Sequence, residues 1–217
     1  MQSESPFLAL DSLGDFTLAN FAAVSRQGAS VRIAPDACLR IQARRAEFLR
    51  FIDAEPTPWV YNVTGGLTGN HATIFSLQER HALTRRFISA GAVLSGESMP
   101  ERMVRGVIFC RLANFIEGHA AVRAEVAVAV AAMLEEPLPS LPVHGHGAAG
   151  EMLLLSHLFG DLVERLALQE KEASALVNGA PVAAALMADT FLQAGPLLAE
   201  VISAVAVAID AFGAPRD

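Results

Sequence analysis

The segment SGESMPERMVRGVIFCRLANFIEG, residues 95–118, decides the fold because its apolar side chains return at helical spacing. The periodic apolar positions are Met103, Val104, Val107, Ile108, Leu112, Phe115 and Ile116. Ser98 and Glu101 form a capping-box pattern, and Pro100 suits the first turn of a helix. Gly118 ends the run. The segment therefore predicts a helix that turns one apolar face toward a core.

Helical periodicity also dominates the chain on both sides of this segment. We expect a helix from Asp36 to about Ala54, capped by Asp36, and another over Val122–Leu134 that the prolines of PLPSLP (137–142) end. The two longest apolar tracts are residues 151–170 and 181–212. Their Ala and Leu content exceeds what one exposed amphipathic face needs, so we expect them to be buried on several sides, in a bundle or against partner chains.

A small β element is expected near the N-terminus, where the segments 16–18 and 30–33 are short and rich in apolar or β-branched residues. No internal repeat or interdomain linker is visible. We therefore expect a mainly α fold in which residues 1–217 form a single domain.

Composition excludes several classes of function. The 217 residues are 53% hydrophobic and carry a net charge of -7 without a block of Lys or Arg, which argues against nucleic acid or an anionic membrane as partner. Cys38 and Cys110 stand far apart without a CxxC pattern, as in a reducing compartment. The acidic N-terminal stretch does not resemble a secretory signal, and Val201–Ile209 is too short to span a bilayer. We expect a soluble, cytoplasmic protein.

The glycine-rich segment WVYNVTGGLTGNHAT, residues 59–73, contains the only tyrosine of the chain, Tyr61. Gly65, Gly66 and Gly69 allow backbone conformations that other residues avoid. A tyrosine hydroxyl can donate or accept a hydrogen bond or act as a base. Two interpretations stay open, a plain surface turn with a half-buried tyrosine or a functional loop.

The segment HGHGAAGEMLLLSH, residues 144–157, has His144, His146, Glu151 and His157 at spacings that could serve a metal ion. An HxH pair in a glycine-rich turn lacks the fixed i,i+4 geometry of the stronger zinc motifs. We therefore favour polar packing in the loop or contact with a substrate, and we place no metal site here.

The order of five segments resembles the histidine and aromatic amino acid ammonia-lyases. These segments are FTLANFAAVSRQGASVRIAPDACLRIQARRAEFL, VYNVTGGLTG, LTRRFISAGAVLSGESMPERMVRGVIFCRLANFIEGHAAVRAEVA, LPSLPVHGHGAAGEM and ALVNGAP. The match runs from about Phe16 to near Leu198 and looks like the N-terminal half of such an enzyme. The resemblance implies an ammonia-lyase-like helical bundle, truncated relative to the family, that assembles as a tetramer with active sites built from several chains.

The resemblance also implies a prosthetic group that this chain cannot make. The family forms an electrophilic methylidene-imidazolone ring from Ala-Ser-Gly, and the exocyclic carbon comes from the serine after loss of water. Here the corresponding triplet is Ala148-Ala149-Gly150. Alanine has no β-hydroxyl to eliminate, so we expect no cofactor of this kind.

Other family positions are partly kept. Tyr61 matches the loop tyrosine that serves as catalytic base, and Asn178 matches the asparagine beside the ring and the substrate carboxylate. We place Gly66 and His146 with Asn178 as candidate substrate contacts. The departures from the family pattern are Gly91 in place of a histidine, Glu151 in place of an aspartate, and Asn62 and Gly65 in place of Gly and Thr.

Three hypotheses of function follow. The first is an enzyme subunit without the ring, which acts on an aromatic or conjugated small molecule by acid/base chemistry (elimination, isomerisation or cyclisation) and is completed by self-association and by a second polypeptide resembling the missing C-terminal half. The second is a structural or regulatory pseudoenzyme, for which Ala149 and Gly91 are the evidence. The third is a metal-dependent enzyme that uses His144 and His146.

Overall fold

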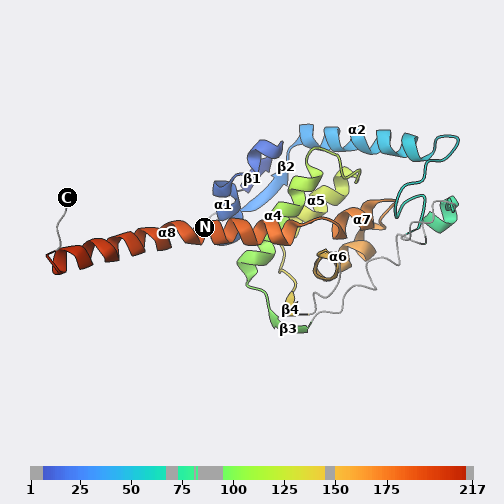
Figure 1. The fold of residues 1–217 in the computed structure, drawn as a ribbon. Helices are drawn as coiled ribbons and strands as arrows, with labels where there is room; N and C mark the ends of the chain where they lie inside the picture. Colours follow the sequence, from blue (N-terminus) through green and yellow to red (C-terminus); the bar gives the residue numbers. More distant parts are fainter. Residues whose placement is uncertain (1–6, 67–72, 81, 83–94, 145–149, 214–217) are drawn as a thin grey trace.

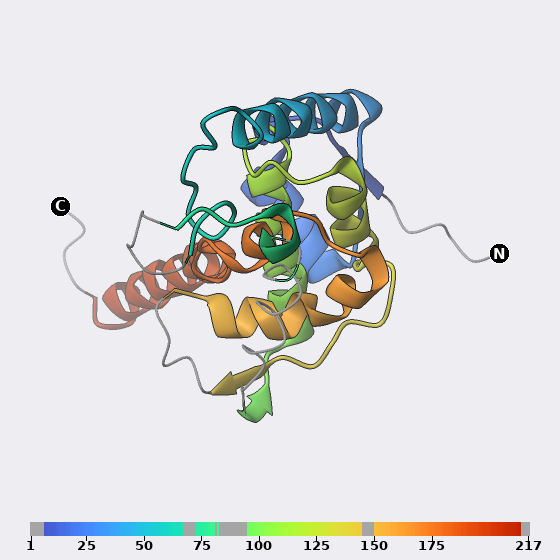
Figure 2. The same cartoon turned by 90° about the vertical axis from the view of Figure 1, so that its right-hand side faces the viewer.

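The computed structural model describes residues 7–66, 73–80, 82, 95–144 and 150–213. Helix α4 (Glu101–Phe115) runs through the middle of the molecule, with α1 (Leu18–Gln27), α5 (Ala124–Ala132) and α8 (Pro181–Ala211) packed around it (Figure 1). Figure 2 shows α2 (Pro35–Ile52) and α6 (Met152–Leu166) on opposite sides of α4. The fold is mainly α-helical, as the sequence predicts.

The central helix is buried on more than the one face that its periodicity predicts. Besides its apolar residues, Arg105 and Arg111 are buried. The Arg105 guanidinium donates hydrogen bonds to the carbonyls of Val24, Ala29 and Leu134 at 2.7, 2.8 and 3.2 Å. These carbonyls lie near the C-terminal ends of α1 and α5, where backbone acceptors lack helical partners. The buried Arg105 of α4 thus joins the C-terminal ends of α1 and α5.

Two predicted caps are wrong, although the helices that they introduce are present. Pro100 is the N-cap of α4, and Ser98 belongs to strand β3 (Ser95–Ser98), which pairs antiparallel with β4 (Pro142–His144). Ala34 is the N-cap of α2, and Asp36 lies in the first turn without a capping hydrogen bond. Because Ser98 pairs with β4, it does not cap the helix.

The N-terminal β element exists, but one of its strands is not where the sequence predicts. Strand β2 (Ser30–Ile33) matches the prediction and pairs in parallel with β1 (Phe7–Leu10). The predicted strand 16–18 is wrong, since Thr17 is the N-cap of α1 and its hydroxyl accepts a hydrogen bond from the amide of Asn20 at 3.1 Å. A capping threonine prevailed over local β propensity.

The predicted tract 151–170 is interrupted after α6, and the short helix α7 (Glu172–Val177) follows. Ala167 and Lys171 have positive φ, which ends one helix and precedes the next. The fully buried Glu172 carboxylate accepts hydrogen bonds from the backbone amide, Nε and Nη2 of Arg123, each at 2.9 Å. This ion pair fixes the start of α7.

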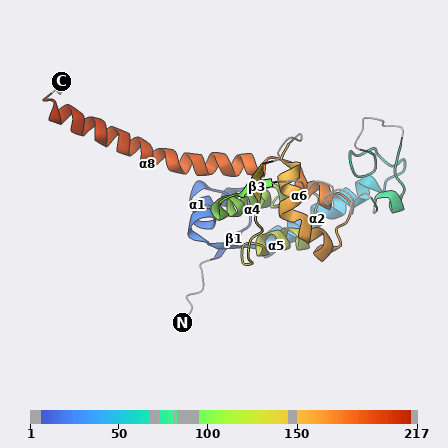
Figure 3. The same cartoon turned by 90° about the horizontal axis from the view of Figure 1, so that it is seen from below.

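Helix α8 matches its predicted bounds and leaves the body of the protein (Figures 1 and 3). Its first turns pack on α4 and α1, and the buried Asp189 carboxylate accepts hydrogen bonds from Arg26 Nε and Nη2 at 3.1 and 2.7 Å. Beyond Asp189 its large apolar side chains are exposed, apart from the half-buried Leu192, from Phe191 at 66% to Phe212 at 88%. In the described part of the chain, the tract Glu172–Ala211 has the length and apolar composition that a membrane span would need.

Candidate functional site

Asn178 ends α7 and begins the turn that leads into α8. Its side-chain Nδ2 donates to the carbonyl and the hydroxyl oxygen of Ser174, both at 2.8 Å. A backbone carbonyl can only accept, so the amide nitrogen must face Ser174. The Asn178 Oδ1 is therefore the side-chain atom left to accept a hydrogen bond from a ligand.

Arg111 of α4 donates hydrogen bonds to the backbone of the same turn. Its Nη1 donates to the carbonyl of Asn178 at 2.6 Å and to that of Ala175 at 3.0 Å. Burial lowers the pKa of the Arg111 guanidinium to about 10, partly offset by the charge of Glu151, so the group stays protonated at neutral pH. The sequence shows only one sign of this role, an arginine in an otherwise apolar stretch of helix.

Glu151, the residue after the degenerate triplet, caps the start of α8. Its two carboxylate oxygens accept hydrogen bonds from the amides of Val182 and Ala183 at 2.6 and 2.7 Å. A carboxylate is favourable here because the first amides of a helix lack partners and the helix dipole is positive at this end. These bonds hold Gly150 beside the start of α8. Val182, the first of the two amide donors, is four residues after Asn178.

Tyr61 lies on a tight turn that backbone hydrogen bonds close. The carbonyl of Val60 accepts from the amides of Val63, Thr64 and Gly65 at 3.1, 3.0 and 3.1 Å. The Thr64 hydroxyl accepts from the amide of Val60 at 2.7 Å. Tyr61 is 50% exposed, and its hydroxyl has no hydrogen-bond partner among the described residues. The turn thus presents a free phenol to the surroundings.

The two departures from the family pattern in this turn have a structural reason. Asn62 adopts φ of 53°, a left-handed conformation that Gly prefers and Asn tolerates. A Cβ at Gly65 would lie 2.0 Å from the Trp59 indole nitrogen, so no side chain fits there unless the indole moves. Trp59 also lies near Tyr61, with ring centroids 6.5 Å apart. A threonine at 65 would therefore require the Trp59 indole to take another position.

The remaining site candidates divide between described and undescribed positions. Gly66 follows the turn and is half-buried. His146, Ala148, Ala149 and Gly91 lie outside the described residues. No hydrogen bond joins the Tyr61 turn to Asn178 within the described part of the chain.

The candidate metal ligands that the structure describes do not gather into a metal site, and the buried Nδ1 of His157 has no hydrogen-bond partner. The His144 ring packs against Gly96 so closely that a Cβ at Gly96 would lie 2.2 Å from it. Both oxygens of Glu151 bind the α8 amides. Among the described residues no group of three His, Cys, Asp or Glu side chains could hold a metal ion. His144 is thus the last residue of β4 and packs across to β3.

Comparison with known proteins identifies the family. The family model described as aromatic amino acid lyase matches residues 16–165. The chain belongs to the aromatic amino acid lyase family. Among curated family members, the histidine ammonia-lyase of Deinococcus radiodurans is 28% identical over 93% of this chain and 43% of its own length. That of Symbiobacterium thermophilum is 30% identical over 91% of this chain and 44% of its own length. The chain thus spans less than half the length of these relatives.

Solved structures of aromatic amino acid lyases and related enzymes share the fold. The histidine ammonia-lyase of Trypanosoma cruzi superposes with a TM-score of 0.75 at 22% identity, covering 96% of this chain and 45% of that one. Pantoea agglomerans phenylalanine aminomutase gives 0.76 at 17% identity, covering 91% and 42%. At this identity the likeness supports the fold alone.

The residues present do not fit the ring expected from the family resemblance. The triplet Ala148-Ala149-Gly150 offers a methyl group where the ring requires a serine hydroxyl as leaving group. Among the described candidate residues, Tyr61 has a half-exposed phenol, Asn178 has an amide oxygen, and the buried Arg111 guanidinium binds the Asn178 carbonyl.

Proposed function

We propose that this chain is a subunit of a ring-free enzyme with the ammonia-lyase fold, which acts on an aromatic or conjugated small molecule by acid/base chemistry. The reaction would be an elimination, isomerisation or cyclisation. The observation that carries the proposal is the combination of Ala149 with a kept Tyr61 and Asn178. The electrophile cannot form, but the groups that move and orient a proton remain.

The roles of the two groups follow from their hydrogen bonds. The Tyr61 hydroxyl has no partner among the described residues, so it is free to contact a bound substrate, and as the phenolate it would take a proton from that substrate and become the phenol. Asn178 offers its Oδ1, because its Nδ2 is engaged by Ser174. It therefore suits a substrate N–H or O–H donor, such as an ammonium or hydroxyl group, better than a carboxylate. Arg111 keeps this amide in place through the Asn178 carbonyl.

The partner half of the proposal rests on α8. In its exposed part, residues spaced by seven are apolar in two interleaved sets: Phe191, Leu198, Val205 and Phe212 in one set, Ile202 and Ile209 in the other. The flanking positions are also apolar, including Ala194, Ala199, Val201, Ala206 and Ala208. Gln193, Glu200, Ser203 and Asp210 lie toward the opposite face, together with the exposed Val207.

A stripe this wide is typical of a bundle. Two-stranded coiled coils carry charges beside the apolar seam, whereas here the flanking positions are apolar as well. One neighbouring helix would leave part of the stripe in water, so at least two neighbours are needed. We therefore propose that α8 packs against copies of itself and against helices of a second polypeptide that supplies the missing half.

The test of chemistry is Tyr61→Phe, once turnover of an aromatic or conjugated compound is found for the assembled protein. Because the substitution removes only the hydroxyl, we expect kcat to fall by about a hundredfold or more with little change in KM. Unchanged kcat would remove Tyr61 from the reaction.

The test of assembly is light scattering of the purified chain with and without a companion chain that resembles the C-terminal half of an ammonia-lyase. We expect a discrete hetero-oligomer. A stable, well-folded monomer that ignores the companion would contradict the partner proposal, and partition of the chain into lipid vesicles would point to a membrane instead. A pseudoenzyme would assemble without turnover, and a metal-dependent enzyme would keep a stoichiometric metal through dialysis.

A further inference from the structure

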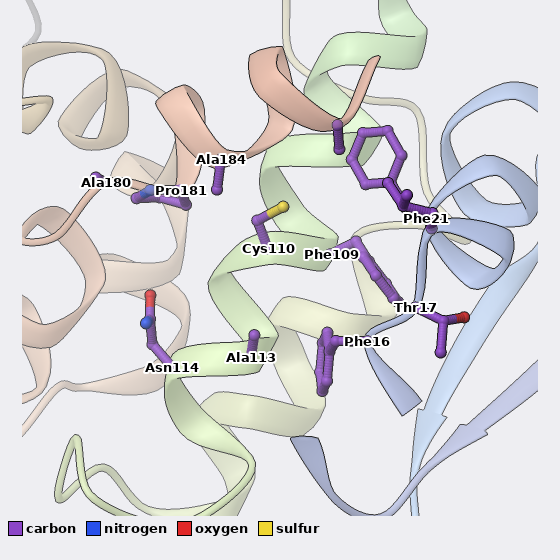
Figure 4. A pocket seen from close by; sticks show the side chains of 12 residues that line it. Phe16, Thr17, Phe21, Phe109, Cys110, Ala113, Asn114, Ala180, Pro181 and Ala184 are labelled. Carbon is purple, nitrogen blue, oxygen red and sulfur yellow. The ribbon is translucent and has the colours of Figure 1, made fainter. Parts of the chain in front are cut away.

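A groove of about 350 Å³ lies between the start of α1, the central helix α4 and the first turns of α8 (Figure 4). It lies on a different flank of α8 from Gly150 and Glu151. Pro181, Ala184 and Ala188 line the groove, whereas Val182, Ala183 and Leu186 face the cavity that contains Gly150 and Glu151. The groove therefore lies apart from the cavity at Gly150 and Glu151, and Arg111 connects it to the Asn178 turn.

The walls of the groove are aromatic and carry no charged side chain. The rings of Phe16 and Phe109 lie with centroids 4.8 Å apart, and Phe21 packs against Phe109 at 6.3 Å. Cys110 points from α4 toward α8 (Figure 4). Burial raises the pKa of the Cys110 thiol to about 12, so it stays neutral. These walls suit a flat or branched apolar body.

The polar end of the groove is Asn114 on α4 (Figure 4). Arg111 Nη1 approaches the Asn114 Oδ1 at 3.4 Å. A guanidinium can only donate, so this contact turns the amide oxygen toward Arg111 and leaves the Asn114 Nδ2 as a donor. A ligand at this end must therefore bring a hydrogen-bond acceptor.

The charge of Arg111, which contacts Asn114, determines which kind of hydrogen-bond acceptor the groove favours. Arg111 is 1% exposed, and its Nε and Nη2 have no hydrogen-bond partner. No carboxylate among the described residues forms an ion pair with it. Its Nη2 lies 3.8 Å from the point where a Cβ would stand at Gly179, directly before the groove residue Ala180. The charge of Glu151 offsets part of the cost of burying Arg111, but no ion pair neutralises the guanidinium, so it still favours a nearby anion.

We propose that this groove binds a small hydrophobic carboxylate. The apolar body packs against Phe16 and Phe109, and the carboxylate accepts a hydrogen bond from Asn114 Nδ2 in the field of Arg111. The groove volume is at the lower end of the range for small-molecule sites, about 300–1,000 Å³, which fits a single ring with a short acid group. The proposal does not depend on turnover or on a partner chain.

The experiment compares benzoate with benzamide, a neutral molecule of nearly the same shape, by calorimetric or ligand-observed NMR titration of the full chain. We expect benzoate to bind about tenfold more tightly or better, since the field of one buried cation corresponds to at least that factor. Equal affinity for the two probes would overturn the role of Arg111, and lack of binding by both would overturn the site.

Two neighbouring alanines of α8 give a matched pair of variants. Ala184→Phe fills the groove from an exposed position, whereas Ala183→Phe adds the same ring on the other flank. We expect benzoate binding to be lost in the first and kept in the second. The opposite result would place the probe in the other cavity and refute the proposal.

Asn114→Leu provides a second test at an exposed residue outside the hydrophobic core. It removes the donor without touching the aromatic walls, so it should weaken benzoate severalfold and leave benzamide less affected. An unchanged preference for benzoate in this variant would exclude Asn114 as the anion contact.

Discussion

The two parts of α8 have similar composition and opposite surroundings. At its base, Pro181 to Asp189, Glu151 caps the first amides, and Asp189 binds Arg26. From Thr190 to Ala211 the large apolar side chains are exposed, apart from the half-buried Leu192. The two parts differ in the hydrogen bonds and the ion pair that attach the base to the body, and not in hydrophobicity.

This comparison explains how a helix with an exposed apolar stripe keeps a defined direction. The anchors at the base come from α1 and from the loop before α6, so they fix the helix relative to the body. Apolar contacts alone are non-directional. We infer that the base sets the orientation and the outer part provides the surface for assembly.

The largest expected effect is loss of the base anchor in Asp189→Ala. The change removes a buried carboxylate that binds Arg26 Nε and Nη2, and it leaves Arg26 partly buried without its partner. Hydrogen bonds to charged groups contribute about 1.5–3 kcal/mol, so we expect the free energy of unfolding to fall by roughly that amount. Urea denaturation by circular dichroism in dilute solution measures it.

Arg102→Ala is the control for this variant, because Arg102 Nε lies 3.6 Å from Asp189 and its side chain is 47% exposed. We expect a loss under about 1 kcal/mol. An equal or larger loss would mean that Arg26 is not the anchor.

The pH dependence sharpens the same test. Burial raises the pKa of Asp189, but the hydrogen bond and charge of Arg26 outweigh it, so the net pKa is lowered. A lowered carboxyl pKa stabilises the fold above its unfolded pKa of about 3.9, and this stability is lost as the pH falls through the folded pKa. The stability difference between wild type and Asp189→Asn should therefore be constant near neutral pH and shrink below about pH 4.

A smaller effect is expected for Glu151→Ala. The variant removes both hydrogen bonds to the Val182 and Ala183 amides. Loss of a helix cap costs about 0.5–2 kcal/mol, and the unfolding experiment detects it. Glu135→Ala, an exposed carboxylate elsewhere, should change stability by less than about 0.5 kcal/mol. Equal effects of the two variants would refute the cap.

Much of the fold follows from local sequence, because apolar periodicity specifies helices such as α4 and α8. The errors arise where a nearby signal competed. Thr17 was read as part of a strand although it precedes the apolar run of α1, where a capping threonine is typical. Ser98 fits a capping box, but pairing of β3 with β4 depends on residues more than 40 positions away, which the local pattern does not contain.

The site shows the same limit more sharply. Tyr61 and Asn178 could be predicted from their match to family motifs. The residues that position them could not. Arg111 and Asn178 are separated by 67 positions, so nothing in the ALVNGAP motif indicates this bond. The close approach of Trp59 to Gly65 depends on how the turn folds back, which glycine content alone does not specify.

A substitution in the outer part of α8 should have the smallest effect on folding stability. The same substitution should have the largest effect on assembly. Ile202 is 60% exposed, so Ile202→Asp should change the unfolding free energy of the dilute chain by less than about 0.5 kcal/mol. In an assembly the same carboxylate would be buried without a partner, which is strongly unfavourable. We expect light scattering to show loss of the oligomer. Ser203→Asp adds the same charge on the polar face and should assemble normally. If both variants assemble like the wild type, the apolar stripe is not the interface, and the division of α8 into an anchor and an assembly surface is wrong.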